Sequence, residues 1–301
     1  MYSRWMNLAV LALWLASMSW LLTQKVLPPM FVGDPPSYET ILDVPEDHPP
    51  TGWNLAINGQ PLGWAVTDVQ RSDSGVTEIQ NHVHFDRLPL NELVPAWLRS
   101  LLKLDDAPLL NLPMDTRNTL TVDALGRLVR VDSAVQFESL PETIRLQGTV
   151  EGSQLLLRVS SGGFSHKAST FLPPDALPGD ALSPQARLPG LRAGQSWTVP
   201  CYNPLRPDNP LEVLQATVEA REPILWQGQT EQVWLVVYRS DAGAALGTQK
   251  KPRGRLWVRG DGAVLRQEVI IFDASIVFLR MTDNESQDLW HDRIPRGDAE
   301  I

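Results

Sequence analysis

The sequence predicts a mainly β protein: one large antiparallel sheet, curved or closed into a half-barrel, with one or two short helices and an N-terminal transmembrane helix. Three observations predict this class. Apolar and polar residues alternate with a period of two after Trp53, glycine-containing turns separate these runs, and Trp5–Leu22 carries no charge. With 301 residues, 43% of them hydrophobic, the chain can bury a large core.

The N-terminal segment 1–24 is predicted to be an uncleaved signal anchor. A helix over Trp5–Leu22 is roughly 27 Å long, close to the thickness of the hydrocarbon layer of a membrane. A cleaved secretory signal, with Ser17-Met18-Ser19 as its best cleavage site, is the alternative, and a buried helix is a third interpretation. Both leading interpretations place the rest of the chain outside the cytoplasm.

Residues 25–50 form a predicted linker that is rich in proline and acidic side chains. Pro-rich segments are extended and stiff, so this linker is expected to act as a stalk that holds a domain away from an anionic membrane. A poorly ordered linker is an equally compatible interpretation.

Residues 51–285 are predicted to form one extracytoplasmic antiparallel β domain, followed by a C-terminal tail, 286–301. Alternation is clear in Glu78–Asp86 and Leu128–Glu138, which places one face of each strand on a core and the other in water. Asn58-Gly59 is a strong hairpin signal. Val233–Tyr238 and Val269–Phe272 are apolar on both faces, so they are expected to be buried on both sides.

Two stretches of this domain do not follow the strand pattern. Asn91–Leu104 has a capping Asn91 and apolar residues at helical spacing, and predicts a helix that covers the sheet. Leu172–Pro200 carries many prolines and predicts a long ordered loop with at most one helical turn.

An internal repeat suggests two similar halves, 51–160 and 195–282, related by a pseudo-two-fold axis. Residues Leu120–Arg130 match Leu256–Arg266 at a fixed offset of 136, with glycine and arginine at the same positions. Hairpin patterns also resemble each other by chance, so two unrelated hairpins are the alternative.

Three motifs carry a resemblance to known families: Ile57–Trp64, Pro189–Trp197 followed by Asn203-Pro204, and Leu256–Glu268. They resemble the β-rich, membrane-anchored extracytoplasmic region that precedes transglutaminase-like domains in some bacteria. More distantly, the chain resembles the periplasmic lipoprotein-carrier fold, a half-barrel with helices in its mouth. The resemblance implies a single-pass protein of the bacterial inner membrane. The transglutaminase-like catalytic domain itself has no counterpart here, so no catalytic residue is carried over.

Composition excludes several classes of function. The net charge of −9 is opposite in sign to that of a typical nucleic-acid binder. A single cysteine, Cys201, excludes an internal disulfide, a cysteine-rich zinc site and an iron–sulfur cluster. His82, His84 and Asp86 share a strand face, but a solvated face is the favoured interpretation. We therefore expect no catalytic residue, no metal and no cofactor.

The predicted function is that of a non-catalytic binding or assembly module. An apolar or lipid ligand is expected in the hollow of the sheet, and a docking domain for envelope proteins is the alternative, with a hydrolase or metal-dependent enzyme less favoured. A basic cluster is expected to contact anionic surfaces. The predicted ligand-binding residues are Trp64, Trp97, Leu101, Trp234 and Trp257, and those of the basic cluster are Lys250, Lys251, Arg253 and Arg255.

Overall fold

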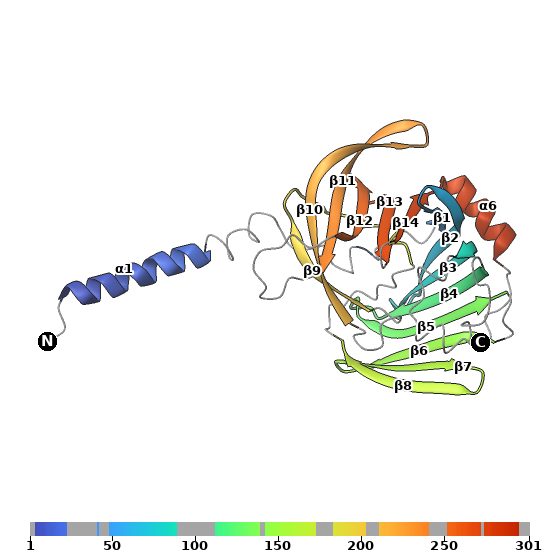
Figure 1. Ribbon diagram of the computed structural model, residues 1–301, viewed down its shortest axis with the longest axis horizontal. Coiled ribbons are helices and arrows are strands. Elements are labelled where there is room, and N and C mark those ends of the chain that lie inside the picture. The colour runs from blue at the N-terminus through green and yellow to red at the C-terminus, as the bar shows by residue number, and fades with distance from the viewer. Residues whose placement is uncertain are drawn as a thin grey trace.

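A computed structural model describes residues 4–22, 41, 48–88, 112–138, 142–172, 183–202, 211–240, 252–271 and 274–294. In this part of the chain, fourteen strands form one antiparallel sheet (Figure 1), in the order β8-β7-β6-β5-β4-β3-β2-β1-β14-β13-β12-β11-β10-β9. Consecutive strands are neighbours with one exception: β8 and β9 lie at the two opposite edges of the sheet, and β1 pairs with β14 in its middle. The predicted mainly β class and the single large antiparallel sheet are therefore confirmed.

The strands range from seven to sixteen residues and are joined by tight turns where the connection is described. Their bounds are β1 Thr51–Ile57, β2 Gln60–Arg71, β3 Thr77–Leu88, β4 Leu112–Val122, β5 Leu128–Phe137, β6 Ile144–Glu151, β7 Gln154–Ser161, β8 Phe164–Phe171, β9 Ser196–Tyr202, β10 Leu211–Trp226, β11 Gln229–Ser240, β12 Pro252–Arg259, β13 Val264–Ile271 and β14 Ala274–Arg280.

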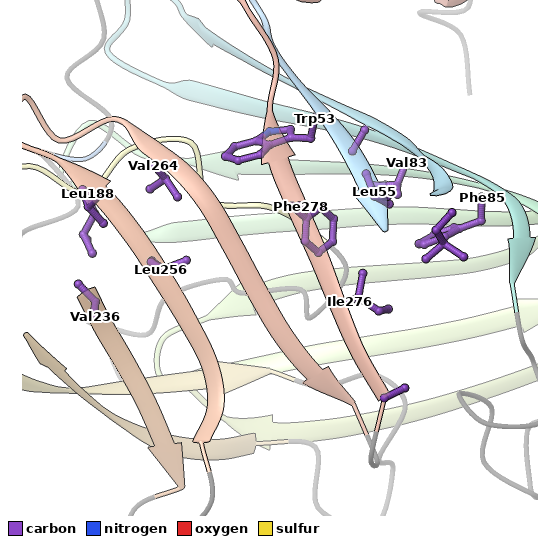
Figure 2. Packing of buried hydrophobic residues seen from close by; sticks show 14 of the residues in the cluster. Trp53, Leu55, Val83, Phe85, Leu188, Val236, Leu256, Val264, Ile276 and Phe278 are labelled. Atoms are coloured by element: carbon purple, nitrogen blue, oxygen red, sulfur yellow. The ribbon is translucent and has the colours of Figure 1, made fainter. Parts of the chain in front are cut away.

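The main core lies on the concave face of the curved sheet. Alternate residues of each strand point to this face, and large side chains such as Trp53, Phe85 and Phe278 are fully buried there. Figure 2 shows them converging from β1, β3 and β14, with Leu188 from the segment 183–195 packed against the same cluster. The pairing of β1 with β14 thus brings the first and the last strand of the chain into one core.

β11 is buried on both faces, as its continuous apolar sequence predicts. Val236 belongs to the concave core, whereas Val233 belongs to a second cluster on the opposite, outer face together with Trp257 and Leu265. The long hairpin formed by β10 and β11 arches over the ends of the neighbouring strands (Figure 1), and its residue Trp226 packs against this outer cluster.

The hairpin turn predicted at Asn58-Gly59 is confirmed. Both residues have positive φ, +49° and +78°, as a two-residue type I′ turn requires. Gln227 and Gly228 repeat this geometry at the tip of the β10–β11 hairpin, with φ of +50° and +75°.

The two hairpins that carry the sequence repeat, β4–β5 and β12–β13, share local geometry. Their ladders shift register at matching positions, after Thr121 and after Trp257. In both turns the glycine, Gly126 or Gly262, donates its N–H to the carbonyl three residues earlier. Because β14 pairs with β1, the six strands β9–β14 continue directly into β1–β8 in the same sheet.

Two helices have bounds in this part of the chain. α1 spans Arg4–Leu21, and no helix among the described residues is both long enough and apolar enough to cross a membrane. α6 spans Asp283–Arg293, where the sequence analysis expected the domain to end and a tail to begin. Its signal was present in the sequence: Thr282 and Glu285 form a capping box, in which each side chain accepts the other's backbone N–H.

α6 is held against the start of β1. The buried Ser286 hydroxyl accepts the Gly52 N–H at 2.9 Å and donates to the Thr282 carbonyl at 2.7 Å. The predicted helix Asn91–Leu104 lies outside the described residues. The predicted loop Leu172–Pro200 is irregular from residue 183, but it is too long by five residues, because strand pairing with β10 begins β9 at Ser196.

Candidate functional site

A row of polar side chains crosses the concave face of the sheet. Strand pairing places its members side by side on five consecutive strands, and they are Thr51, Thr67, Asn81, Asn118 and Ser133. All except the half-buried Ser133 are at most 5% exposed. We call this set the polar row.

The polar row divides two apolar regions of the concave face. On β3, Asn81 lies between Val83, in the main core, and Ile79, which packs against a separate apolar cluster that includes Leu155 and Leu157. On β4, Asn118 lies likewise between Met114 and Leu120. The concave face is therefore apolar at both ends and polar in the middle.

Hydrogen bonding satisfies part of the polar row. The Thr67 hydroxyl donates to Asn81 Oδ1 at 2.7 Å, and Arg280 Nη2 donates to Thr51 Oγ1 at 3.4 Å. Asn118 Oδ1 has no hydrogen-bond partner, nor does the indole Nε1 of Trp53 on the same face. A buried polar atom without a partner costs roughly 1–3 kcal/mol, so these two atoms mark positions where the concave face offers an unused acceptor and an unused donor.

The three described tryptophans that were expected to line one hollow do not share a face. Trp234 lies on the concave side, where the Arg221 guanidinium stacks 4.2 Å from its ring centroid. Trp257 lies on the outer face under Arg266, and its Nε1 donates to Glu222.

Trp64 also lies on the outer face, opposite to its neighbour Ala65 in the core. The prediction that Trp64, Trp234 and Trp257 line one hollow is therefore wrong. Adjacent positions along a strand face opposite sides of the sheet, and these three tryptophans fall on different sides. The other two predicted ligand-binding residues, Trp97 and Leu101, lie outside the described residues.

A polar cluster on the outer face gathers around Trp64. Its ring stacks on His84 at 5.5 Å between centroids and meets His82 edge-on at 5.1 Å. Asp115 Oδ1, on β4, accepts from His82 Nε2 at 3.3 Å and from His84 Nδ1 at 2.9 Å.

The hydrogen bond from His82, together with that from His84, lowers the pKa of Asp115 to about 2, although partial burial opposes the shift. The alternation along β3 predicts that these histidines share a strand face with Asp86, and His84 Nε2 lies 3.3 Å from Asp86 Oδ1. Asp115 was missed because only strand pairing brings β4 beside β3. In the described part of the chain, no three His, Cys, Asp or Glu side chains are placed to hold a metal.

The described members of the predicted basic cluster are engaged within the protein. Arg255 Nη1 donates to Glu268 Oε2 at 2.6 Å, and Arg253 Nε donates to Ser240 Oγ at 3.1 Å. Lys250 and Lys251 lie outside the described residues. Cys201 lies in β9.

The sequence did hold a signal for the polar row. Its members on β2, β3 and β5 each occupy an inward position in an otherwise apolar alternation, as Asn81 does between Ile79 and Val83, whereas Asn118 on β4 follows a second inward polar residue, Thr116. What the alternation could not give is the pairing that sets these residues side by side.

No protein-family model matches the sequence, and no curated protein matches it. Solved structures that match this chain include the following two. One is a β-barrel-like protein of the domain of unknown function DUF1849 from Brucella abortus, with a TM-score of 0.46 and 11% identity, which covers 78% of this chain and 96% of that one. The other is a DUF1089 family protein from Pseudomonas aeruginosa, with a TM-score of 0.32 and 16% identity, over 67% and 87% of the two chains. Both TM-scores are below 0.5, so neither similarity carries an argument about function.

Proposed function

We propose that this protein is a non-catalytic, membrane-anchored extracytoplasmic module that holds a ligand with an acyl chain and a polar group against the concave face of its sheet. The observation that carries this proposal is the pair of unpartnered buried atoms, Trp53 Nε1 and Asn118 Oδ1, on a face that is apolar on either side of the polar row. Ligand sites are commonly apolar surfaces with a few polar groups that fix orientation.

The separation of the two atoms favours a long ligand over a small one. Trp53 is on β1 and Asn118 is on β4, three strand spacings away, or roughly 14 Å at ~4.8 Å per spacing. One small polar molecule does not reach both. A lipid is long enough to extend over both positions, with an ester or hydroxyl group at one of the two atoms and its acyl chain along the apolar part of the face.

The proposed location rests on the N-terminal segment. Trp5–Leu22 has no charged residue, and apolar side chains of α1 such as Leu13 and Trp20 are exposed, each 69%. We propose that this segment directs the chain to the bacterial inner membrane and leaves the β domain outside the cytoplasm. Protease accessibility in spheroplasts tests the orientation, and the mass of the mature chain distinguishes an anchor from a cleaved signal.

The ligand is tested by native mass spectrometry of the full chain, extracted gently from its membrane. We expect a discrete added mass that organic solvent removes. Asn118→Leu removes the unpartnered acceptor and is expected to reduce the ligand-bound fraction several-fold, without lowering the unfolding temperature, since an unsatisfied buried group is replaced by an apolar one.

Asn54→Leu is the matched control. Asn54 is exposed on β1 and points away from the concave face, so the same substitution there is expected to leave the bound fraction unchanged. A bare mass for the wild-type chain, with no uptake from phospholipid vesicles, would overturn the proposal, as would equal retention by the two variants.

A docking domain for an envelope protein is the second candidate, and the edge strand β8 favours it. Among the described strands, β8 pairs with β7 alone, and Ser165–Ser169 in its middle are exposed, as is Phe171 at 61%. An open edge can accept a strand from another protein. Site-specific crosslinking from β8 in cells tests this candidate: a discrete protein adduct supports it, and the absence of any adduct argues against it.

A further inference from the structure

A pocket of about 590 Å³ is lined by the tip of the β10–β11 hairpin, the ends of β12 and β14, and the start of α6. Its walls include Trp226 at the hairpin tip, Arg259 and Asp261 at the β12–β13 turn, Arg280 at the end of β14, Asp283 at the start of α6, and Arg187. The volume is that of a typical small-molecule site.

The hairpin tip that roofs the pocket is fixed in place. Trp226 Nε1 donates to the Arg280 carbonyl at 2.9 Å, and the Arg259 guanidinium lies 5.7 Å from the Trp226 ring centroid. The indole is therefore a held aromatic wall beside a guanidinium.

The charge of the pocket is positive, although the chain as a whole carries −9. Three guanidinium groups, from Arg187, Arg259 and Arg280, face two carboxylates. One of the carboxylates, Asp261, is paired with Arg259 at 2.7 Å, and the other, Asp283, lies at the N-terminal end of α6.

Arg280 is already oriented. Its Nη1 donates to the Ala186 carbonyl at 3.1 Å, and its Nη2 contacts Thr51 Oγ1 at 3.4 Å, so little side-chain freedom remains to be lost on binding. Burial lowers the pKa of this guanidinium, and the positive charges of Arg259 and Arg187 act in the same direction, against Asp283 and Asp261. A bound anion would relieve that repulsion.

We propose that this pocket binds a phosphate group, with Arg187 and Arg280 as its charged contacts and the organic part of the ligand against Trp226. Guanidinium groups match phosphate in geometry and charge. The phosphate belongs either to a small soluble phosphate ester or to a phospholipid headgroup. This site borders the concave face, where Arg280 contacts Thr51 of the polar row, and it requires no ligand on that face.

Isothermal titration calorimetry of the full chain in a nonionic detergent tests the proposal, with inorganic phosphate, glycerol 3-phosphate and dihexanoyl phosphatidylglycerol as probes. Arg187→Gln is expected to weaken binding by about tenfold, through the loss of one charge-assisted contact. Asp283→Asn removes a competing carboxylate and is expected to tighten binding several-fold, a gain that misfolding does not produce.

Arg158→Gln is the matched control, because Arg158 is exposed on β7 and does not line the pocket. Tighter binding of glycerol 3-phosphate assigns a soluble ester, and tighter binding of the phosphatidylglycerol assigns a headgroup. The proposal is overturned if none of the probes binds at about 10 mM, or if Arg187→Gln and Asp283→Asn bind as Arg158→Gln does.

Discussion

Gly63 and Gly59 lie in the same hairpin and differ in what a side chain would meet. Both have positive φ, +152° and +78°, so alanine at either position pays a backbone cost of roughly 1–2 kcal/mol. A Cβ at Gly63 would lie 2.0 Å from the carbonyl oxygen of His84, on the paired strand β3. A Cβ at Gly59 would meet nothing within 4 Å.

The extra cost of Gly63→Ala follows from this contact. Relief requires β2 and β3 to separate by about 1 Å, which weakens roughly two ladder hydrogen bonds worth about 1 kcal/mol each. Phe85, the register partner of Gly63, is fully buried and must repack, at about 1–3 kcal/mol. We therefore expect Gly63→Ala to be less stable than Gly59→Ala by about 3–5 kcal/mol.

Thermal unfolding followed by circular dichroism measures the difference. For a chain of this size, 3–5 kcal/mol corresponds to a midpoint lower by about 5–15 °C. Unfolding midpoints within about 2 °C of each other for the two alanine variants would contradict this expectation, because the close approach of β2 to the His84 carbonyl would then cost nothing.

Two further predictions concern a charge and a buried hydroxyl. Since the pKa of Asp115 is held at about 2, below its ordinary 3.8, its stabilisation is full above about pH 4 and is lost as the pH falls towards 2. With the carboxylate 46% exposed, we expect Asp115→Asn to cost only about 1 kcal/mol near pH 5, and most of that cost to be absent at pH 2, where the carboxyl is half protonated in the folded chain. Urea unfolding at both pH values checks this, and a cost of the same size at both contradicts it. Ser286→Ala leaves the buried Gly52 N–H without its acceptor, so we expect the free energy of unfolding in urea to fall by about 1–3 kcal/mol. The control is Ser169→Ala, on the exposed edge strand, which should cost little. Equal effects of the two substitutions would show that Ser286 does not hold α6.

Local sequence signals account for much of the fold. The period of two in Glu78–Asp86 identified a strand within β3 and separated Val83 and Phe85 from His82 and His84, since successive side chains of any strand face opposite ways. Asn58-Gly59 identified the first hairpin, because few other pairs tolerate two positive φ angles. The apolar sequence Val233–Tyr238 also predicted burial on both faces, and the structure confirms it.

The candidate sites depended on contacts that no local pattern contains. The polar row needs the register of five strands, and Asp115 joins the histidines only because β4 pairs with β3. The phosphate pocket gathers Arg187, Trp226 and Arg280 from segments far apart in the chain.

The strands, the turns and the alternation of faces can be predicted from the sequence, because they follow from backbone sterics and side-chain direction over a few residues. Which face is concave, the pairing of β1 with β14, and the contact of Ser286 with Gly52 across 234 residues appear only in the folded chain. Register and sheet curvature depend on pairing between distant strands and on the packing of the whole core. Neither produces a periodic pattern of residues along the sequence, so neither can be predicted from local patterns.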